Sequence, residues 1–188
     1  MTRANPKPIA HGADPGHPKL ASLIDAGVIR RAGIVALILG SVLTLANQPG
    51  AIFGGVSVQV LPLVLVYLTP FVVVTVSQLL GIRLALLDAG RGQAPVFPRD
   101  AFLATALSRG IPLRSLLLGL IVGTVNTSIV ISAALMDGGK LADLPAALIG
   151  QAFVLPVLFG LVSQTISYRR AALVTGRRLQ AEAQPLSI

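Results

Sequence analysis

Four long apolar segments, each bounded by polar residues or by glycine and proline, dominate the pattern of the chain. They run from about Ala32 to Ala46, Leu61 to Leu87, Leu113 to Met136 and Leu144 to Ser167. A helix needs ~20 apolar residues to cross the ~30 Å hydrocarbon core of a bilayer. The first segment is shorter than this at a rise of ~1.5 Å per residue, so it must borrow flanking residues. The pattern predicts an all-α integral membrane protein with four transmembrane helices.

Proline and glycine mark where these helices begin, end and bend. The sequence Asn47-Gln48-Pro49-Gly50 ends the first segment, and Pro62 is well placed to open the second. Pro70 and Pro156 lie inside the second and fourth segments. There the missing N–H donor and the clash of the ring predict kinks.

The amino-acid composition agrees with membrane insertion and excludes several kinds of catalytic and metal site. Of the 188 residues, 54% are hydrophobic and 12% charged, and the mean hydropathy is +0.81; a soluble domain cannot bury that much apolar surface. The absence of cysteine excludes disulfides, thiolate metal sites and cysteine nucleophiles. No residues have the spacing of a metal site or of a nucleophile with its base. We therefore expect no enzyme activity, no cofactor and no metal.

The net charge of +8 is concentrated on one side of the apolar segments, and only Lys140 falls on the other. By the positive-inside rule, both termini and the central loop are cytoplasmic, and the loops Asn47 to Val60 and Met136 to Leu144 face outward. The orientation of the chain in the membrane accounts for the excess of lysine and arginine, so we expect no nucleic-acid partner. The residues on the basic side are Arg3, Lys7, Lys19, Arg30, Arg31, Arg83, Arg91, Arg99, Arg109, Arg114, Arg169, Arg170, Arg177 and Arg178.

The chain contains two copies of one helical hairpin. Four positions of the first copy recur 83 residues later and five recur 86 residues later, including the run Pro-x6-Ser-Gln-x4-Arg twice. Each copy has two spans, so both enter the membrane in the same orientation, which predicts parallel repeats. The matched pairs are Arg31/Arg114, Gly40/Gly123, Leu61/Leu144, Pro62/Pro145, Tyr67/Phe153, Pro70/Pro156, Ser77/Ser163, Gln78/Gln164 and Arg83/Arg169.

The repeat divides the chain into five parts. Residues 1–28 form a polar cytoplasmic arm, 29–88 the first two-helix repeat, 89–112 a basic cytoplasmic linker, 113–172 the second repeat, and 173–188 a basic tail that continues the last helix before ending disordered. A signal peptide would also place basic residues before an apolar run. The long polar leader, and the later counterpart of the first segment, argue against it.

Small residues recur every four positions on the first span of each copy. Such faces let helix backbones approach closely in lipid, so we interpret them as packing faces, with a pore lining as the alternative. Four helices barely enclose a path, so we expect a homo-oligomer packed through these faces. They comprise Ala32, Ala36, Gly40 and Thr44 in one copy and Ser115, Gly119, Gly123 and Thr127 in the other.

Neutral hydrogen-bonding side chains lie at one depth in the second and fourth spans. They are Ser77, Gln78, Ser163 and Gln164, and Arg83 and Arg169 follow five residues after the glutamines. Bonding between helices and snorkelling of the arginines are the simpler interpretations. No Asp, Glu, Lys or His falls clearly inside a span, which leaves carboxylate-based ion coupling without a residue. Neutral donors flanked by arginine favour a weakly hydrated monoanion.

One set of residues resembles a known family. The stretch Gly40-x6-Asn47-Gln48-Pro49-Gly50-Ala51-Ile52-Phe53, followed by Tyr67-Leu68-Thr69-Pro70-Phe71 and Val76-Ser77, is similar to the small NrtS-type nitrate/nitrite transporters. The resemblance covers about Arg31 to Arg83 and implies a tandem fusion of two such units that takes up nitrate or nitrite across the bacterial inner membrane. For such transport we expect the following substrate-binding residues: Asn47 and Gln48 near the outer entrance, Thr69, Ser77, Gln78, Ser163 and Gln164 as anion contacts, and Arg83 and Arg169 as electrostatic sinks.

Two features leave other functions open. The second copy lacks the Asn-Gln turn, has Asn126 inside its first span and has Leu155 in place of Thr69, so the halves need not be equivalent. The basic loop and tail would also suit a non-transporting scaffold or assembly subunit that recruits a soluble partner or anionic lipid. A channel for another small anion or neutral solute is the third possibility.

Overall fold

The computed structural model describes residues 23–48, 52–55, 60–91, 102–136 and 146–183, and over these residues the fold is all-helical. The helices are α1 (Ala26–Asn47), α3 (Val60–Gly90), α4 (Phe102–Ser108), α5 (Ile111–Met136) and α6 (Ala146–Ala183). All except α4 are long and apolar enough to cross a membrane. The prediction of an all-α protein with four helices long and apolar enough to span a membrane is therefore confirmed over the described residues.

Helix α1 begins six residues before the predicted apolar segment, and these residues add the length that the segment lacked for crossing a bilayer. Asp25 precedes it in an extended conformation, and its Oδ1 accepts a hydrogen bond of 2.6 Å from the backbone N–H of Val28. Such an N-cap satisfies one of the free N–H groups at a helix start. At the other end, the N–H of Gln48 donates to the carbonyl of Thr44 at 2.8 Å.

Two other boundaries also differ from the sequence-based limits. Helix α6 extends past the predicted end of the fourth span at Ser167 and runs through the basic tail to Ala183. The stretch 89–112, predicted as a basic loop, contains the short helix α4 and the first residues of α5. Gly110, with φ of +62°, makes the turn between them, a conformation that only glycine adopts without strain.

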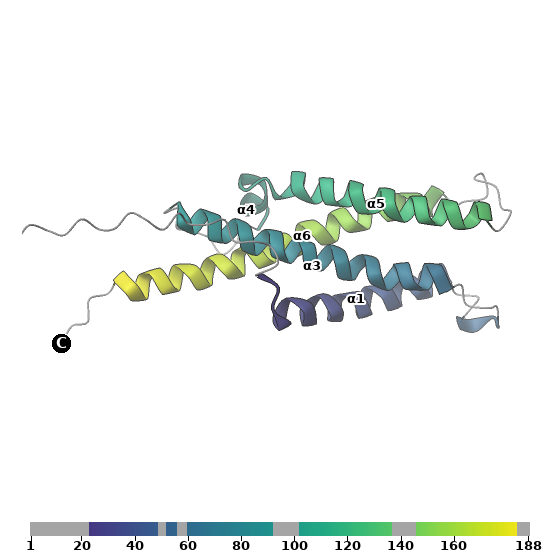
Figure 1. The fold of residues 1–188 in the computed structure, drawn as a ribbon, viewed down its shortest axis with the longest axis horizontal. Helices are drawn as coiled ribbons and strands as arrows, with labels where there is room; N and C mark the ends of the chain where they lie inside the picture. Colours follow the sequence, from purple (N-terminus) through teal and green to yellow (C-terminus); the bar gives the residue numbers. More distant parts are fainter. Residues whose placement is uncertain (1–22, 49–51, 56–59, 92–101, 137–145, 184–188) are drawn as a thin grey trace, which may run out of the picture.

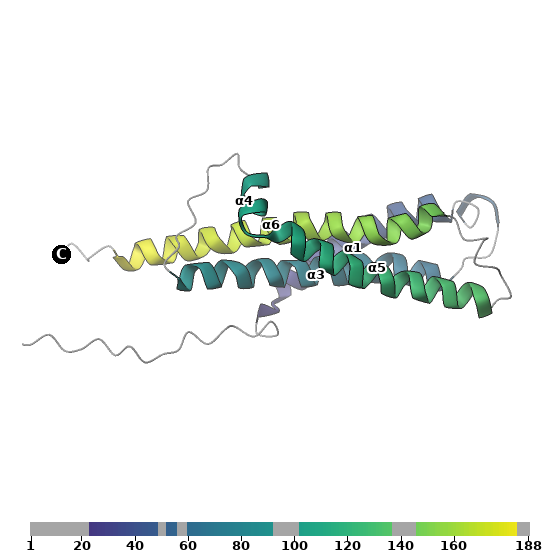
Figure 2. The same cartoon turned by 90° about the horizontal axis from the view of Figure 1, so that it is seen from above.

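The helices form an elongated bundle with α3 and α6 at its centre (Figures 1 and 2). These two helices pack along each other, α1 covers α3, and α5 covers α6. Helix α4 lies beside α5 and α6 at the end of the bundle that holds the C-terminus. Each predicted hairpin thus contributes one central helix and one outer helix.

Outer and inner surfaces of the bundle differ as expected for a protein in lipid. Large apolar side chains point outward, such as Leu37 and Ile121, each 63% exposed. The centre holds apolar residues such as Val73 together with polar ones, including Ser77 and Thr165, which are both fully buried. Pro70 and Pro156 are buried inside α3 and α6; the kinks predicted at them stay a prediction.

The small-residue faces pack inside the chain. A Cβ added to Gly40 would collide with the Tyr67 ring of α3, and one added to Gly123 with the Phe153 ring of α6. The interpretation of these faces as packing surfaces is therefore right. Because helices of the same chain already cover them, they do not offer a surface on which a second copy could pack.

Candidate functional site

The two central helices lie in close backbone contact at Gly81. A Cβ on this residue would meet the carbonyl oxygen of Gln164 and would lie 2.9 Å from the backbone nitrogen of Tyr168. Both atoms belong to the α6 backbone, which cannot move aside as a flexible side chain does. Glycine thus sets the spacing of α3 and α6, and it fixes which polar side chains meet around the crossing.

Three buried polar side chains meet one turn from Gly81, and we call them the central polar cluster: Ser77 of α3, Ser115 of α5 and Gln164 of α6. Each is at most 1% exposed. The hydroxyl of Ser115 donates to Oε1 of Gln164 at 3.5 Å. Gly160 leaves room for the contact: a Cβ there would lie 3.4 Å from Oγ of Ser77 and 3.5 Å from Oγ of Ser115.

Two atoms of this cluster have no hydrogen-bond partner among the residues that the structure describes. They are Oγ of Ser77 and Nε2 of Gln164. A buried polar atom without a partner costs about 1–3 kcal/mol of stability, so most proteins avoid it. The central polar cluster therefore has unused hydrogen-bonding capacity in the middle of an apolar bundle.

The repeat-related glutamine has a different environment. Gln78 is 4% exposed, and its Oε1 accepts a hydrogen bond of 3.2 Å from Nε of Arg31 on α1. Gln164 instead bonds to Ser115, the residue after Arg31's counterpart Arg114. Ser163 is only half-buried, since it points about 100° away from Gln164 around the helix. Of the four predicted donors, only Ser77 and Gln164 meet in the cluster.

A cavity of about 810 Å³ opens beside this cluster, toward the C-terminal ends of α1 and α5. It lies among α3, α5, α6 and the end of α1, and its walls are mostly apolar. Two of its lining residues are close to the cluster along the helices: Val73 of α3 lies one helical turn before Ser77, and Phe159 of α6 directly precedes Gly160. The cavity and the central polar cluster are thus neighbours.

Polar groups in the cavity come from both hairpins. Nδ2 of Asn126 donates to Oγ1 of Thr69 at 2.9 Å and joins α5 to α3. Gln48 also lines the cavity, and its role at an outer entrance stays a prediction; the side chain of Asn47 lies outside the described residues. Thr69 was expected from the sequence as a substrate contact, whereas its partner Asn126 was noted only as a departure from the repeat.

The predicted arginines lie apart from this cavity. Arg83 lines a separate groove between α3 and α5 together with Arg114. Arg169 is half-buried on α6, one position after Tyr168. The electrostatic roles predicted for Arg83 and Arg169 stay predictions.

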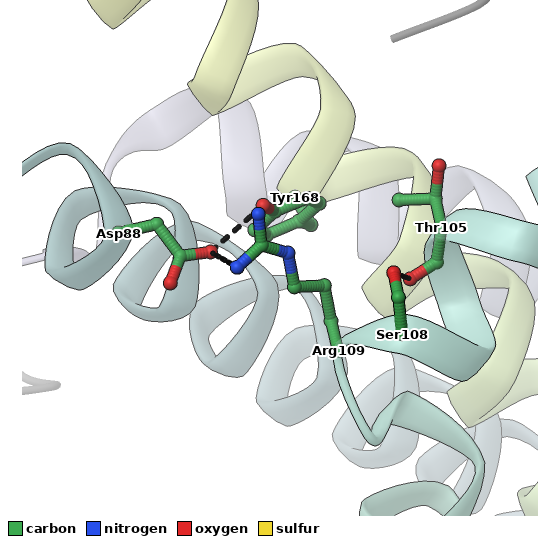
Figure 3. A network of polar contacts seen from close by, with 5 residues as sticks. All are labelled: Asp88, Thr105, Ser108, Arg109 and Tyr168. Atoms are coloured by element: carbon green, nitrogen blue, oxygen red, sulfur yellow. Dashed lines mark hydrogen bonds and ion pairs between the residues drawn. The ribbon is translucent and has the colours of Figure 1, made fainter. Parts of the chain in front are cut away.

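A buried charge cluster at the α4 end of the bundle was missed by the sequence analysis. Asp88 is 3% exposed, and its Oδ2 accepts a hydrogen bond of 2.8 Å from the hydroxyl of Tyr168 (Figure 3). The same oxygen forms an ion pair of 3.1 Å with Nη1 of Arg109. The Arg109 guanidinium also lies 5.8 Å from the centre of the Tyr168 ring. We call Asp88, Arg109 and Tyr168 the clamp, because they join α3, the linker after α4, and α6.

The expectation that no acidic residue falls inside a span does not hold for Asp88, which belongs to the candidate span Val60–Gly90. Helix α3 continues three residues past Leu87, where the apolar segment ends. One signal could have found it: Ser77, Gly81 and Asp88 recur at spacings of four and seven, which places them on one helix face. Elsewhere in the described ranges, no group of three His, Asp or Glu side chains could hold a metal.

Comparison of the chain with protein-family models, with curated proteins and with solved structures finds no match. The resemblance to NrtS-type transporters therefore stays a prediction that rests on the quoted residues alone. The function has to be argued from the cavity, the central polar cluster and the charges around them.

Proposed function

We propose that this multi-pass membrane protein moves a small inorganic monoanion, nitrate or nitrite, across the bacterial inner membrane. The observation that most supports this is the free Nε2 of Gln164, since its Oε1 already accepts from Ser115. A primary amide nitrogen can only donate hydrogen bonds. The ligand that satisfies it must present an acceptor, as the oxygens of nitrate and nitrite do.

The surroundings favour a weakly hydrated anion over a cation. Most of the cavity wall is apolar, so an ion that enters must lose part of its hydration shell, and the free-energy cost of this loss must be small. The carboxylate of Asp88, which could attract a cation, is occupied by Arg109 and Tyr168. Donors without a nearby free carboxylate are the arrangement that anion pathways use.

The proposed path begins in the outer cavity beside Thr69 and Asn126. It continues past Val73 to Ser77 and Gln164, and ends among the cytoplasmic arginines. The tight packing of α3 on α6 at Gly81 closes this path below the cluster. We infer that the structure is open toward the outside and that passage requires the central helices to move apart.

We further propose that the two hairpins are parallel repeats with cytoplasmic termini. Gly40 packs on the Tyr67 ring, and the positions matched to them by the repeat, Gly123 and Phe153, pack in the same way. Equivalent contacts at equivalent positions support a duplicated hairpin. A homo-oligomer remains part of the proposal, formed through surfaces other than the small-residue faces.

The test is anion flux into liposomes that contain the purified protein, with nitrate and chloride in competition at a clamped membrane potential. Gln164→Met and Ser77→Ala remove the free donor groups while keeping the volume similar. Nitrate flux should fall about tenfold or more for Gln164→Met, since a hydrogen bond to a charged group is worth about 1.5–3 kcal/mol. Ser77→Ala should not unfold at a lower temperature, because Oγ of Ser77 has no partner among the described residues. Gln164→Met also removes Oε1, which accepts from Ser115, so its unfolding temperature should fall slightly, and flux is compared for protein shown to be folded.

Ser132→Ala is the matched control, because this serine is exposed on α5. It should leave nitrate flux unchanged. Full flux in Gln164→Met would remove this side chain from the path. No flux of either anion through folded wild-type protein would overturn the proposal and favour a scaffold.

A further inference from the structure

A second feature, independent of the transport proposal, is a groove on the flank of the bundle. It has a volume of about 500 Å³ and is lined by residues of α3 and α5 only. Six of its eight lining residues are leucine or isoleucine, and the other two are Arg83 and Arg114. The groove therefore combines two positive charges with an apolar surface that faces away from the central helix pair.

The charges of the two arginines are not balanced by an acidic side chain. Within the described ranges, the ion pair of the structure joins Asp88 to Arg109, not to Arg83 or Arg114. The Nε atom of Arg83 is buried and has no hydrogen-bond partner there. A guanidinium group binds phosphate through paired N–H donors, so two of them in one groove suit a phosphate group.

The apolar wall continues from these charges toward the membrane interior. On α5, Leu118 and Ile121 follow Arg114 by four and seven residues, which places them one and two turns deeper. Ile121 is 63% exposed, so this wall lies open to lipid. A free phosphate ion would gain nothing from it, whereas an acyl chain would cover it.

We propose that this groove binds one anionic phospholipid, with its phosphate between Arg83 and Arg114 and an acyl chain along the leucines. Basic pockets between helices on the cytoplasmic side suit such headgroups. A net negative lipid fits better than a zwitterionic one, because the groove has no carboxylate to face a choline or ammonium group. Arg83 then holds a lipid rather than the transported anion, which departs from its predicted role.

The experiment uses the delipidated full-length protein in detergent, with phosphatidylglycerol or phosphatidylcholine added. Native mass spectrometry measures the lipid retained, and thermal unfolding measures the stabilisation. Phosphatidylglycerol should bind roughly thirtyfold more tightly than phosphatidylcholine, the effect of two basic side chains near an anionic headgroup. Arg83→Gln/Arg114→Gln should bring the two lipids to within about twofold.

Two further variants separate the groove from general charge. Arg83→Lys/Arg114→Lys keeps both charges and should retain most of the preference. Arg30→Gln/Arg170→Gln removes two exposed arginines outside the groove and should retain all of it. An equal loss of preference in this control would show non-specific attraction and overturn the proposal.

Wild-type protein alone also tests the proposal, should the groove variant fail to fold. Equal retention of both lipids would overturn it. So would stabilisation by inorganic phosphate equal to that by phosphatidylglycerol, because it would show a site for free anions. A greater effect of long-chain than of six-carbon phosphatidylglycerol would support the contact of the chain with the leucines.

Discussion

Asp88 is the residue whose surroundings differ most from what its sequence position suggests. It follows directly after an apolar segment, yet it is buried and holds two partners, Tyr168 and Arg109. A buried carboxylate is tolerated only when it is paired and hydrogen-bonded. Because its partners come from α6 and from the linker after α4, Asp88 ties both hairpins and their connection together.

Loss of the Asp88 carboxylate should destabilise the protein. In Asp88→Ala, Tyr168 loses its hydrogen-bond acceptor and Arg109 loses its counter-ion. The free energy of unfolding should fall by about 2–3 kcal/mol. This is less than for a fully buried pair, because Arg109 keeps some exposure to water. Tyr168→Phe removes one hydrogen bond, so it should cost about 1 kcal/mol. Denaturant unfolding in micelles gives both values. Wild-type stability in Asp88→Ala would show that the clamp contributes nothing.

The site residues were only partly predictable, because their neighbours are far apart in the sequence. Ser77 and Gln164 could be singled out as polar residues inside apolar spans. For Asp88, the spacing from Ser77 and Gly81 indicates its helix face, but its partner was hidden, since Tyr168 lies 80 positions away and no local pattern links the two. The opposite environments of Gln78 and Gln164 were also hidden, because the repeat makes these residues look equivalent.

At the scale of helices, the crossing of α3 and α6 depends on a missing side chain. Gly81 meets backbone atoms of α6, whereas Gly33 on α1 has nothing within 4 Å of an added Cβ. The two glycines thus provide a direct comparison between a packed position and an open one within transmembrane helices.

Gly81→Ala should destabilise the bundle, and Gly33→Ala should not. The alanine at 81 would force the central helices apart, at a cost of about 1–3 kcal/mol or more. At position 33, alanine should stabilise the helix by about 0.5–1 kcal/mol. Thermal unfolding of the two variants beside wild type measures both effects. Equal stability of Gly81→Ala and wild type would mean that the crossing is looser than its geometry shows.

The helices themselves were the most predictable part of the fold. Hydropathy identifies them because a span must satisfy its backbone hydrogen bonds internally and bury apolar side chains in lipid. Helix α4 escaped detection because its seven residues carry no span-like pattern. The partner of each small-residue face was also not predictable, since such faces fit helices of the same chain as well as those of a second copy.

At the scale of the whole molecule, orientation in the membrane can be tested because the chain has no cysteine. Phe53 is 79% exposed between α1 and α3, and Leu107 is 69% exposed on α4. With cytoplasmic termini, Phe53→Cys should react with a membrane-impermeant maleimide in intact cells. Leu107→Cys should react only after the inner membrane is opened. The reverse pattern would invert the topology.

The distance along the chain between the partners of the clamp sets an order of events during synthesis. Tyr168 follows Asp88 by 80 residues, and a ribosome adds about 5–20 residues per second, so roughly 4–16 seconds separate them. For that interval the inserted first hairpin presents Ser77, Gly81 and Asp88 without α6. The newly made first hairpin thus exposes a polar surface that the finished bundle conceals, until the last helix packs against it.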